Sequence, residues 1–535
     1  MSTLYDAFRA AVADSAALPF LCVPPLEGRD YAPEGCELSY GEAGKAVDVL
    51  IRTYRRAGYG HGHRIAFCLE NRPAYILHLL ALSAIGASAV PVNPDYAEGE
   101  LLYLLDHSGS DLLITLDHRL DFCTRVAAQA QKRPPVLVFR AGDDLPPPAM
   151  AATEHEPAAD TEICLLYTSG TTGRPKGCIL TNEYFLTAGE WYRTLGGVID
   201  IVQGQERLFN PLPLFHMNAG ALSLTCMILA RGCLIIPDRF HPKSWWQEVA
   251  DSRASIIHYL GIIPPLLLNQ PPGEDEKRHC VKFGVGAGIE PELHRRCEER
   301  FGFPLVEIWG MTETGRILAD CHEPRMIDTR AFGRPVKELE AMVVDEQGRE
   351  VPCGQSGELV VRAGGKDPRK GFFAGYLNNE EATEDAWKGG WFHTGDTVRQ
   401  DESGMLFFID RKKNIIRRSG ENIAAAEVEA ALQSLDDVAQ VAVIAVPDEL
   451  RDEEVMACIV PMPGVQGDET LARTLMKALE AKLAYFKLPG WWLFLDSLPT
   501  TGTQKVQKTR IFPAGQDPRE ACGIIDLRAL KKRKK

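Results

Sequence analysis

The sequence predicts an α/β protein of more than one domain: a large layered N-terminal α/β domain with a small β subdomain, then a small α+β domain. Three observations predict it. A chain of 535 residues is too long for one ordinary core. Strand-length apolar runs, such as 65–68 and 112–116, alternate with helix-length segments through much of the first 400 residues. Glycine-rich turns then separate short strand-like runs between residues 338 and 408.

Further elements follow from the same patterns. Residues 163–167 read as a buried strand, and 182–195 are long enough for a helix. Residues 74–92 contain His78, Gly86 and Pro91, so they read as a buried helix running into a strand rather than as a membrane span. We therefore expect no integral membrane segment.

The last part of the chain predicts a compact α+β unit. Residues 424–434 suit a helix, and 438–446 and 455–460 suit buried strands. Residues 470–484 suit an amphipathic helix, because leucines recur at every fourth position (Leu471, Leu475, Leu479 and Leu483). We set the boundary at the end of residue 410, which gives domains of 1–410 and 411–535.

Composition excludes several classes of protein. The net charge of −14 leaves no overall basic character for nucleic-acid binding. The fourteen cysteines include no Cys-x-x-Cys pair, which argues against a zinc site or disulfide framework and suits a reducing cytoplasm. The first residues lack a basic segment followed by an apolar one, so no signal peptide is expected. The basic end, 531–535, reads as a solvated terminus.

The most informative stretch is 167–177, which reads Tyr-Thr-Ser-Gly-Thr-Thr-Gly-Arg-Pro-Lys-Gly. A strand that leads into a loop of glycines and hydroxyl residues presents N–H and O–H donors to an anion. Arg174 and Lys176 add positive charge, so the expected ligand is a polyphosphate. The loop is not a Walker A sequence, because Gly170 and Gly173 are three apart and Gly177 follows the lysine. The plainer alternative is a solvated loop.

This run resembles the nucleotide loop of the adenylate-forming superfamily, which includes acyl-CoA synthetases, luciferases and peptide-synthetase adenylation domains. Five further stretches resemble its motifs in the same order: 309–314, 390–396, 410–413, 419–423 and 498–506. The resemblance spans about residues 30 to 512. It implies a large AMP-binding domain and a mobile C-terminal lid. Residues 446–453 and 485–489 look most like the crotonobetaine/carnitine-CoA ligase group.

The resemblance implies ATP, Mg²⁺ and coenzyme A as ligands. It assigns the phosphates to the loop that begins at Thr168 and to Lys176, adenine to two segments, ribose to Asp396 with Arg411, and pantetheine to the loop at Ser419 and Gly420. The loop residues are Thr168, Ser169, Gly170, Thr171, Thr172 and Gly173, and the adenine segments are Gly286, Ala287 and Gly288 and Trp309, Gly310 and Met311. Thr312, like Thr168, could bind phosphate. Trp309 could instead be a core residue, and Asp396 could belong to an ordinary turn.

Glu313 with Thr168 is the expected Mg²⁺ site, since oxygen ligands completed by water and phosphate suit that ion. Lys505 is the expected catalytic residue, because an ammonium is needed where a carboxylate meets a triphosphate. The family usually has glycine where Gln504 stands. His216 is expected beside the carboxylate pocket, with a binding or gating role.

The predicted reaction converts a carboxylic acid and ATP into acyl-AMP and pyrophosphate, and then CoA into acyl-CoA and AMP. An alternative is an adenylation enzyme that loads a separate carrier protein; a non-catalytic adenylate-binding protein is a third class. A trimethylammonium acid would want an aromatic cage. The candidates are Phe215, Trp191 and Tyr192. The acid and the oligomeric state, including a homodimer, stay open.

Overall fold

The computed structural model describes residues 2–140, 142–168, 175–411, 414–418, 421–448, 451–480, 482–483, 485–500, 506–513 and 515–531. The chain packs as two compact units. The first comprises residues 1–340 and 362–392, and the second comprises 341–361 and 393–535. The second unit thus begins before residue 411, and the predicted boundary at residue 410 stays a prediction.

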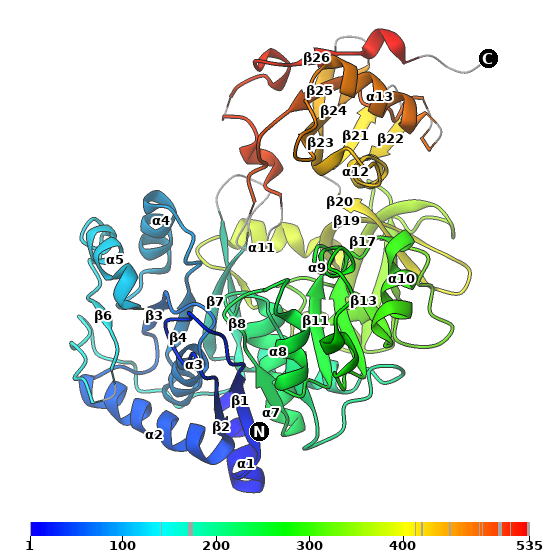
Figure 1. Cartoon of the computed structure of the whole chain (residues 1–535). Coiled ribbons are helices and arrows are strands. Elements are labelled where there is room, and N and C mark those ends of the chain that lie inside the picture. Colours follow the sequence, from blue (N-terminus) through cyan, green and yellow to red (C-terminus); the bar gives the residue numbers. More distant parts are fainter. Residues whose placement is uncertain are drawn as a thin grey trace. The chain divides into compact units, whose positions relative to one another are not determined.

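The first unit contains two large sheets covered by helices, as the alternating pattern predicts (Figure 1). One sheet has the order β18-β8-β7-β4-β3-β5-β6. Its strands are β18 (Gly375–Tyr376), β8 (Lys176–Thr181), β7 (Glu162–Thr168), β4 (Ser88–Pro91), β3 (Arg64–Phe67), β5 (Leu112–Thr115) and β6 (Val136–Val138). A buried apolar cluster joins it to α4 (Glu98–Ser108) and α5 (Leu120–Ala127).

The other sheet has the order β14-β13-β12-β11-β9-β10-β1-β2 and is parallel from β13 to β1. Its strands are β14 (Ile317–Ala319), β13 (Leu305–Gly310), β12 (Phe283–Ala287), β11 (Ile256–Leu260), β9 (Arg207–Phe209), β10 (Cys233–Ile235), β1 (Pro19–Val23) and β2 (Cys36–Ser39). Because parallel strands end at one edge, the segments after β11, β12 and β13 lie together there.

Helices of the first unit follow the predicted segments. The helix and strand expected within 74–92 are α3 (Pro73–Ile85) and β4, and the helix expected at 182–195 is α6. No helix among the described residues combines the length and apolarity that a membrane crossing requires. Helix α6 spans Asn182–Arg193, and the unit also contains α1 (Leu4–Ser15), α2 (Tyr40–Ala57), the π-helix η2 (Asn218–Ser223), α7 (Leu224–Ala230), α8 (Trp245–Asp251), α9 (Ile263–Leu268), α10 (Pro291–Phe301) and α11 (Glu380–Ala386).

The second unit contains the predicted α+β body and most of a small sheet, which the sequence predicts as a subdomain of the N-terminal domain. The small sheet includes β16 (Leu339–Val344), β17 (Ser356–Ala363), β19 (Phe392–Gln400) and β20 (Leu406–Arg411). The body contains β21 (Ile415–Arg418), β22 (Glu421–Ala424), α12 (Ala425–Gln433), β23 (Val438–Asp448), β24 (Asp452–Pro461), α13 (Glu469–Leu479), β25 (Trp491–Phe494) and β26 (Ile525–Asp526). The expected helix 470–484 is therefore shorter and ends at Leu479.

Candidate active site

The hairpin of β7 and β8 brings the ends of the predicted phosphate loop together. Thr168 pairs with Lys176 in the last register position of the hairpin. Residues 169–174, including Ser169, Gly170, Thr171, Thr172 and Gly173, lie outside the described part of the chain. The strand before the loop, predicted from residues 163–167, is present as β7.

Tyr376 on β18 links the β7–β8 hairpin, which holds the ends of the predicted phosphate loop, to the 309–314 motif that contains Glu313. Its backbone pairs with Cys178 of β8, and its hydroxyl donates a 2.9 Å hydrogen bond to Glu313 Oε1. The Lys176 ammonium lies 4.5 Å from the centre of the Tyr376 ring, a cation–π contact. The structure therefore brings Lys176 and Glu313 to the same tyrosine. Sequence reasoning missed Tyr376.

Cys178 joins Thr168 to the same cluster. Its sulfur lies 3.9 Å from Thr168 Oγ1. Burial, and then the negative charge of Glu313, raise the pKa of the Cys178 thiol, so it stays protonated. Glu313 is only 7% exposed. A carboxylate and a hydroxyl around one small thiol form an oxygen-rich site beside the phosphate hairpin.

The predicted adenine segments end two neighbouring parallel strands, β12 and β13. Gly286 has no room for a side chain, because a Cβ there would lie 2.4 Å from the Tyr259 ring. Gly288 adopts φ +87°, which favours glycine. Ala287 and Gly288 are at least partly exposed. Packing therefore explains the glycine at position 286. The segment also lies at the sheet edge where the parallel strands end.

Glu307 of β13, which sequence reasoning missed, fixes the segment after β12. Its carboxylate accepts hydrogen bonds from Gly288 N at 2.8 Å, Ile289 N at 3.3 Å and Tyr259 Oη at 2.9 Å. Burial raises the pKa of Glu307 to about 7. An isolated glutamate in an apolar strand gave no sequence motif that could have found it.

The remaining residues of the 309–314 motif differ in exposure. Trp309 is 6% exposed and its ring centroid lies 6.1 Å from that of Phe332, so much of it packs as a core residue does. Gly310 is exposed, and Met311 and Thr312 are half-buried. Thr312 O accepts a 2.7 Å hydrogen bond from Tyr184 Oη, which holds the turn against α6.

His216 is exposed and lies just before η2, in ring contact with Phe215 at 4.7 Å. Two of the three candidate cage residues, Trp191 and Tyr192, have different surroundings. Tyr192 is fully buried and bonds His258, whereas Trp191 donates to Ile317 O and faces the Arg316 guanidinium at 5.6 Å. Successive helix positions point in different directions, which sequence proximity conceals.

The ribose candidates belong to the second unit. Asp396 of β19 and Arg411 of β20 pair across the small sheet, and their side chains approach to 3.4 Å. Asp396 is 3% exposed, and its backbone N–H donates to Thr394 Oγ1 at 3.1 Å. The predicted pair is therefore assembled. Lys412, Lys413, Ser419, Gly420 and Lys505 lie outside the described residues.

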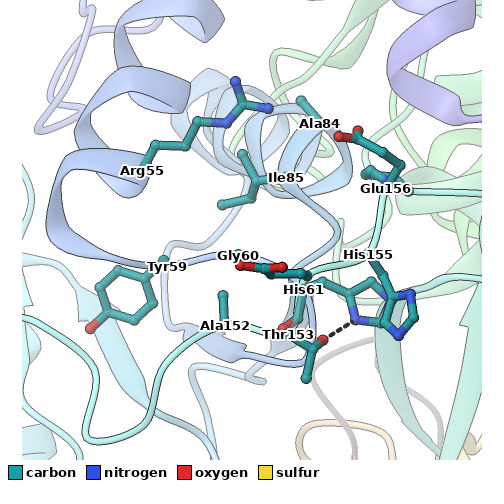
Figure 2. A pocket seen from close by; sticks show the side chains of 12 residues that line it. Arg55, Tyr59, Gly60, His61, Ala84, Ile85, Ala152, Thr153, His155 and Glu156 are labelled. Atoms are coloured by element: carbon teal, nitrogen blue, oxygen red, sulfur yellow. Dashed lines mark hydrogen bonds between the residues drawn. The ribbon is translucent and has the colours of Figure 1, made fainter.

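A surface pocket of about 360 Å³ lies elsewhere in the first unit, where α2 and α3 end against residues 152–157 (Figure 2). His61 Nδ1 lies 2.8 Å from Thr153 Oγ1 there. None of the predicted site residues line this pocket.

Comparison with known proteins agrees with this architecture. Residues 13–377 match the AMP-binding enzyme family, and 427–505 match the AMP-binding enzyme C-terminal domain. A feruloyl-CoA synthase from Amycolatopsis sp. is 32% identical over 89% of this chain and 94% of its own. A crotonobetaine/carnitine-CoA ligase from Proteus mirabilis is 27% identical over 89% and 93%.

A solved structure of ATP-bound MatB from Rhodopseudomonas palustris aligns with a TM-score of 0.80 at 25% identity, over 96% of this chain and 98% of that one. The predicted α/β fold with a smaller C-terminal domain is thereby confirmed. The chain belongs to the AMP-binding enzyme family and is an ATP-dependent, AMP-forming acyl-CoA ligase.

Proposed function

We propose that the ATP phosphates bind at the open end of the β7–β8 hairpin. The observation that carries this is the cluster around Tyr376, where Lys176 and Glu313 meet one side chain beside Thr168. Lys176 supplies positive charge, while Thr168, Ser169, Gly170, Thr171, Thr172 and Gly173 supply hydroxyl and backbone donors. A half-buried lysine interacts with phosphate more strongly than one in open water.

Mg²⁺ fits the same cluster. Glu313 and Thr168 would hold the ion through a carboxylate and a hydroxyl oxygen, which are ligand types that it prefers. The low exposure of Glu313 supports this, since a buried carboxylate gains from a nearby cation. When bound, the ion would neutralise phosphate charge as the acid approaches.

Adenosine recognition is proposed for two sets of residues. Gly286, Ala287, Gly288, Trp309, Gly310 and Met311 bind adenine, and Glu307 positions the first of these segments. Thr312 binds phosphate together with Thr168. Asp396 accepts hydrogen bonds from the ribose hydroxyls, and Arg411 orients that carboxylate from the facing strand. The burial of Asp396 supports a ligand-binding role over an ordinary surface turn.

Lys505 is proposed as the catalytic lysine of acyl-AMP formation, and Ser419 and Gly420 as the opening for the CoA thiol. His216 borders the acid, and its exposure next to Phe215 supports this role. The domain boundary after residue 410, a cytoplasmic location and the part played by any homodimer remain predictions.

The identity of the acid is tested with a panel of carboxylates. Wild-type enzyme is assayed for pyrophosphate release with ATP and Mg²⁺, with and without CoA, on betaine-type, aromatic, fatty and short polar acids. If the enzyme acts in carnitine metabolism, we expect the highest kcat/KM on a betaine; if it acts in fatty-acid metabolism, we expect it on an alkyl acid. Turnover with a carrier protein's phosphopantetheine but not with CoA would favour the carrier-loading alternative. No pyrophosphate release with any acid would contradict the proposed function.

A further inference from the structure

A buried polar network lies inside the first unit, where α6, β11 and η2 meet. Tyr192 Oη lies 2.7 Å from His258 Nε2, and His258 Nδ1 lies 2.7 Å from Asn218 Oδ1. Asn210 Nδ2 donates to the same Asn218 oxygen at 2.9 Å and to Ser223 Oγ at 2.9 Å. Tyr192, His258, Asn210 and Ser223 are each at most 1% exposed, whereas Asn218 is half-buried.

The protons of this network can be assigned by counting donors and acceptors. Burial lowers the pKa of His258 to about 3, so the ring is neutral and carries one proton. Two acceptors do not approach to 2.7 Å, so that proton lies on Nδ1 and points to Asn218 Oδ1. Nε2 then accepts from the Tyr192 hydroxyl.

Asn210 is fixed in the same way. Its Oδ1 accepts a 2.9 Å hydrogen bond from Leu212 N, so its Nδ2 is the group that faces Asn218. The Asn218 oxygen therefore accepts from both His258 and Asn210. Its amide cannot flip without placing N–H groups against two donors. The Asn218 Nδ2 group is thus turned away from the network, with two N–H donors to offer.

The position of Asn218 connects this donor to the acid. It is the first residue of η2 and follows His216 by two positions. Within the part of the chain that the structure describes, Asn218 Nδ2 has no hydrogen-bond acceptor. One-turn π-helical segments recur at functional sites. Asn218 is half-buried, so a fixed donor on it, beside the proposed acid pocket, is placed where it could contact a substrate.

We propose that Asn218 Nδ2 is a specificity-determining donor that selects acids bearing a hydrogen-bond acceptor, such as an oxo or hydroxyl oxygen, over unsubstituted alkyl acids. His258, Asn210 and Tyr192 are positioning residues that hold the Asn218 amide in one orientation. This inference rests on the proposed function, in which the acid binds beside His216. An alkyl acid would leave the donor unpaired and lose binding in the transition state.

The test uses straight-chain acids of three to eight carbons in matched unsubstituted, hydroxy and oxo forms. Initial rates of AMP formation with ATP, Mg²⁺ and CoA give kcat/KM for each. Wild-type enzyme is expected to favour the hydroxy and oxo forms by roughly tenfold to a hundredfold at its best chain length. Asn218→Asp keeps an acceptor for both network donors but turns a second acceptor toward the acid.

Asn218→Asp should therefore retain activity on the hydroxy acid, whose hydroxyl can donate a hydrogen bond. It should lose activity on the oxo acid, which has no such donor. Asn93→Asp is the matched control, because it adds the same charge at a surface turn where Asn93 Oδ1 only accepts from Asp95 N. Thermal unfolding midpoints are compared for all three proteins. The expected effect of Asn218→Asp is a change in the oxo-to-hydroxy ratio, which a loss of stability alone would not produce.

Three outcomes would overturn the inference: a wild-type preference for unsubstituted acids at every length, an unchanged oxo-to-hydroxy ratio in Asn218→Asp, or an equal loss on all acids with a lowered unfolding midpoint. Activity on the unsubstituted acids alone would leave the proposed function intact. Absence of AMP formation with every straight-chain acid would overturn this inference alone. The proposed function would be contradicted only if the betaine-type, aromatic, fatty and short polar acids of the wider panel also gave no pyrophosphate release.

Discussion

Tyr376 connects the two sequence motifs that are proposed to bind the phosphates and Mg²⁺. Its hydroxyl donates a hydrogen bond to Glu313 Oε1, and its ring makes a cation–π contact with the Lys176 ammonium. Burial, and then the charge of Glu313, raise the pKa of Tyr376, so the phenol remains a donor throughout the working range of pH. One side chain thus orients a proposed metal ligand and a proposed phosphate ligand.

Tyr376→Phe should weaken ATP use while preserving the fold. The ring below Lys176 stays, but Glu313 loses a donor; a hydrogen bond to a charged group is worth about 1.5–3 kcal/mol. The expected result is a fall of roughly tenfold to a hundredfold in kcat/KM for ATP, with little change in the KM for CoA. Wild-type kinetics in the variant would show that this hydrogen bond does not matter for catalysis.

Sequence motifs indicated Thr168, Lys176 and Glu313 as candidate site residues, but they could not indicate Tyr376 or Glu307. The first three lie in short runs with unusual composition. Tyr376 lies beside the hairpin of Lys176 because β18 pairs with β8, and Glu307 reaches Gly288 because β12 and β13 are neighbours. Contacts that depend on strand order across the fold leave no local pattern in a sequence.

The hydrogen bonds of Glu307 show how one strand controls the loop after another. The β12 strand ends at Ala287, and both following backbone N–H groups donate to the β13 carboxylate. An ionised carboxylate accepts these bonds best, yet burial disfavours its charge. The two effects oppose each other, and burial prevails.

Stability should therefore depend on pH through Glu307. Its pKa in the folded protein is raised to about 7, above the ordinary value of 4.5, so its contribution is full below about pH 4.5 and is lost as pH rises through 7. The difference corresponds to about 3 kcal/mol at most. Urea unfolding at pH 5 and pH 8 should show a larger fall in wild type than in Glu307→Gln. Equal pH dependence in both proteins would contradict this.

Sequence periodicity predicted where helices and strands lie better than it predicted where they end. The leucine spacing predicted one helix over 470–484, but α13 ends at Leu479. Leu483 N then donates to Leu479 O at 2.8 Å, and Leu483 packs against the same apolar core. A fourfold leucine spacing is satisfied equally by a helix or by a helix followed by a turn, so the sequence could not separate them.

The second unit joins the proposed ribose pair to the lid through Asp410. The carboxylate of Asp410 accepts from Asn414 Nδ2 at 3.2 Å and from Ala426 N at the start of α12 at 2.8 Å. The end of β20 is thereby tied to the first turn of α12 on both sides of residues 412–413. A rotation of the α+β body relative to β20 would therefore have to break the hydrogen bond between Ala426 N and Asp410.

Lys413→Pro tests whether the enzyme alternates between two poses. Proline fixes φ and removes a backbone N–H, so rotation at this position is restricted. We expect acyl-AMP to form near the wild-type rate and acyl-CoA to form more slowly, by roughly tenfold or more. The reason is that the attack of the thiol needs a different lid orientation from the one that forms acyl-AMP. Lys413→Ala is the control. Single-turnover rates equal to wild type in both steps would place the hinge elsewhere.

The most direct test of the whole account measures the two half-reactions of Lys505→Ala separately. The ammonium is needed where the carboxylate meets the α-phosphate, and it has no comparable task when the thiol attacks the acyl carbon. Rapid-quench measurement of acyl-AMP formation from acid and ATP should show most of the rate lost. Conversion of supplied acyl-AMP and CoA into acyl-CoA should proceed near the wild-type rate. An equal loss in both half-reactions would contradict the proposed division of labour.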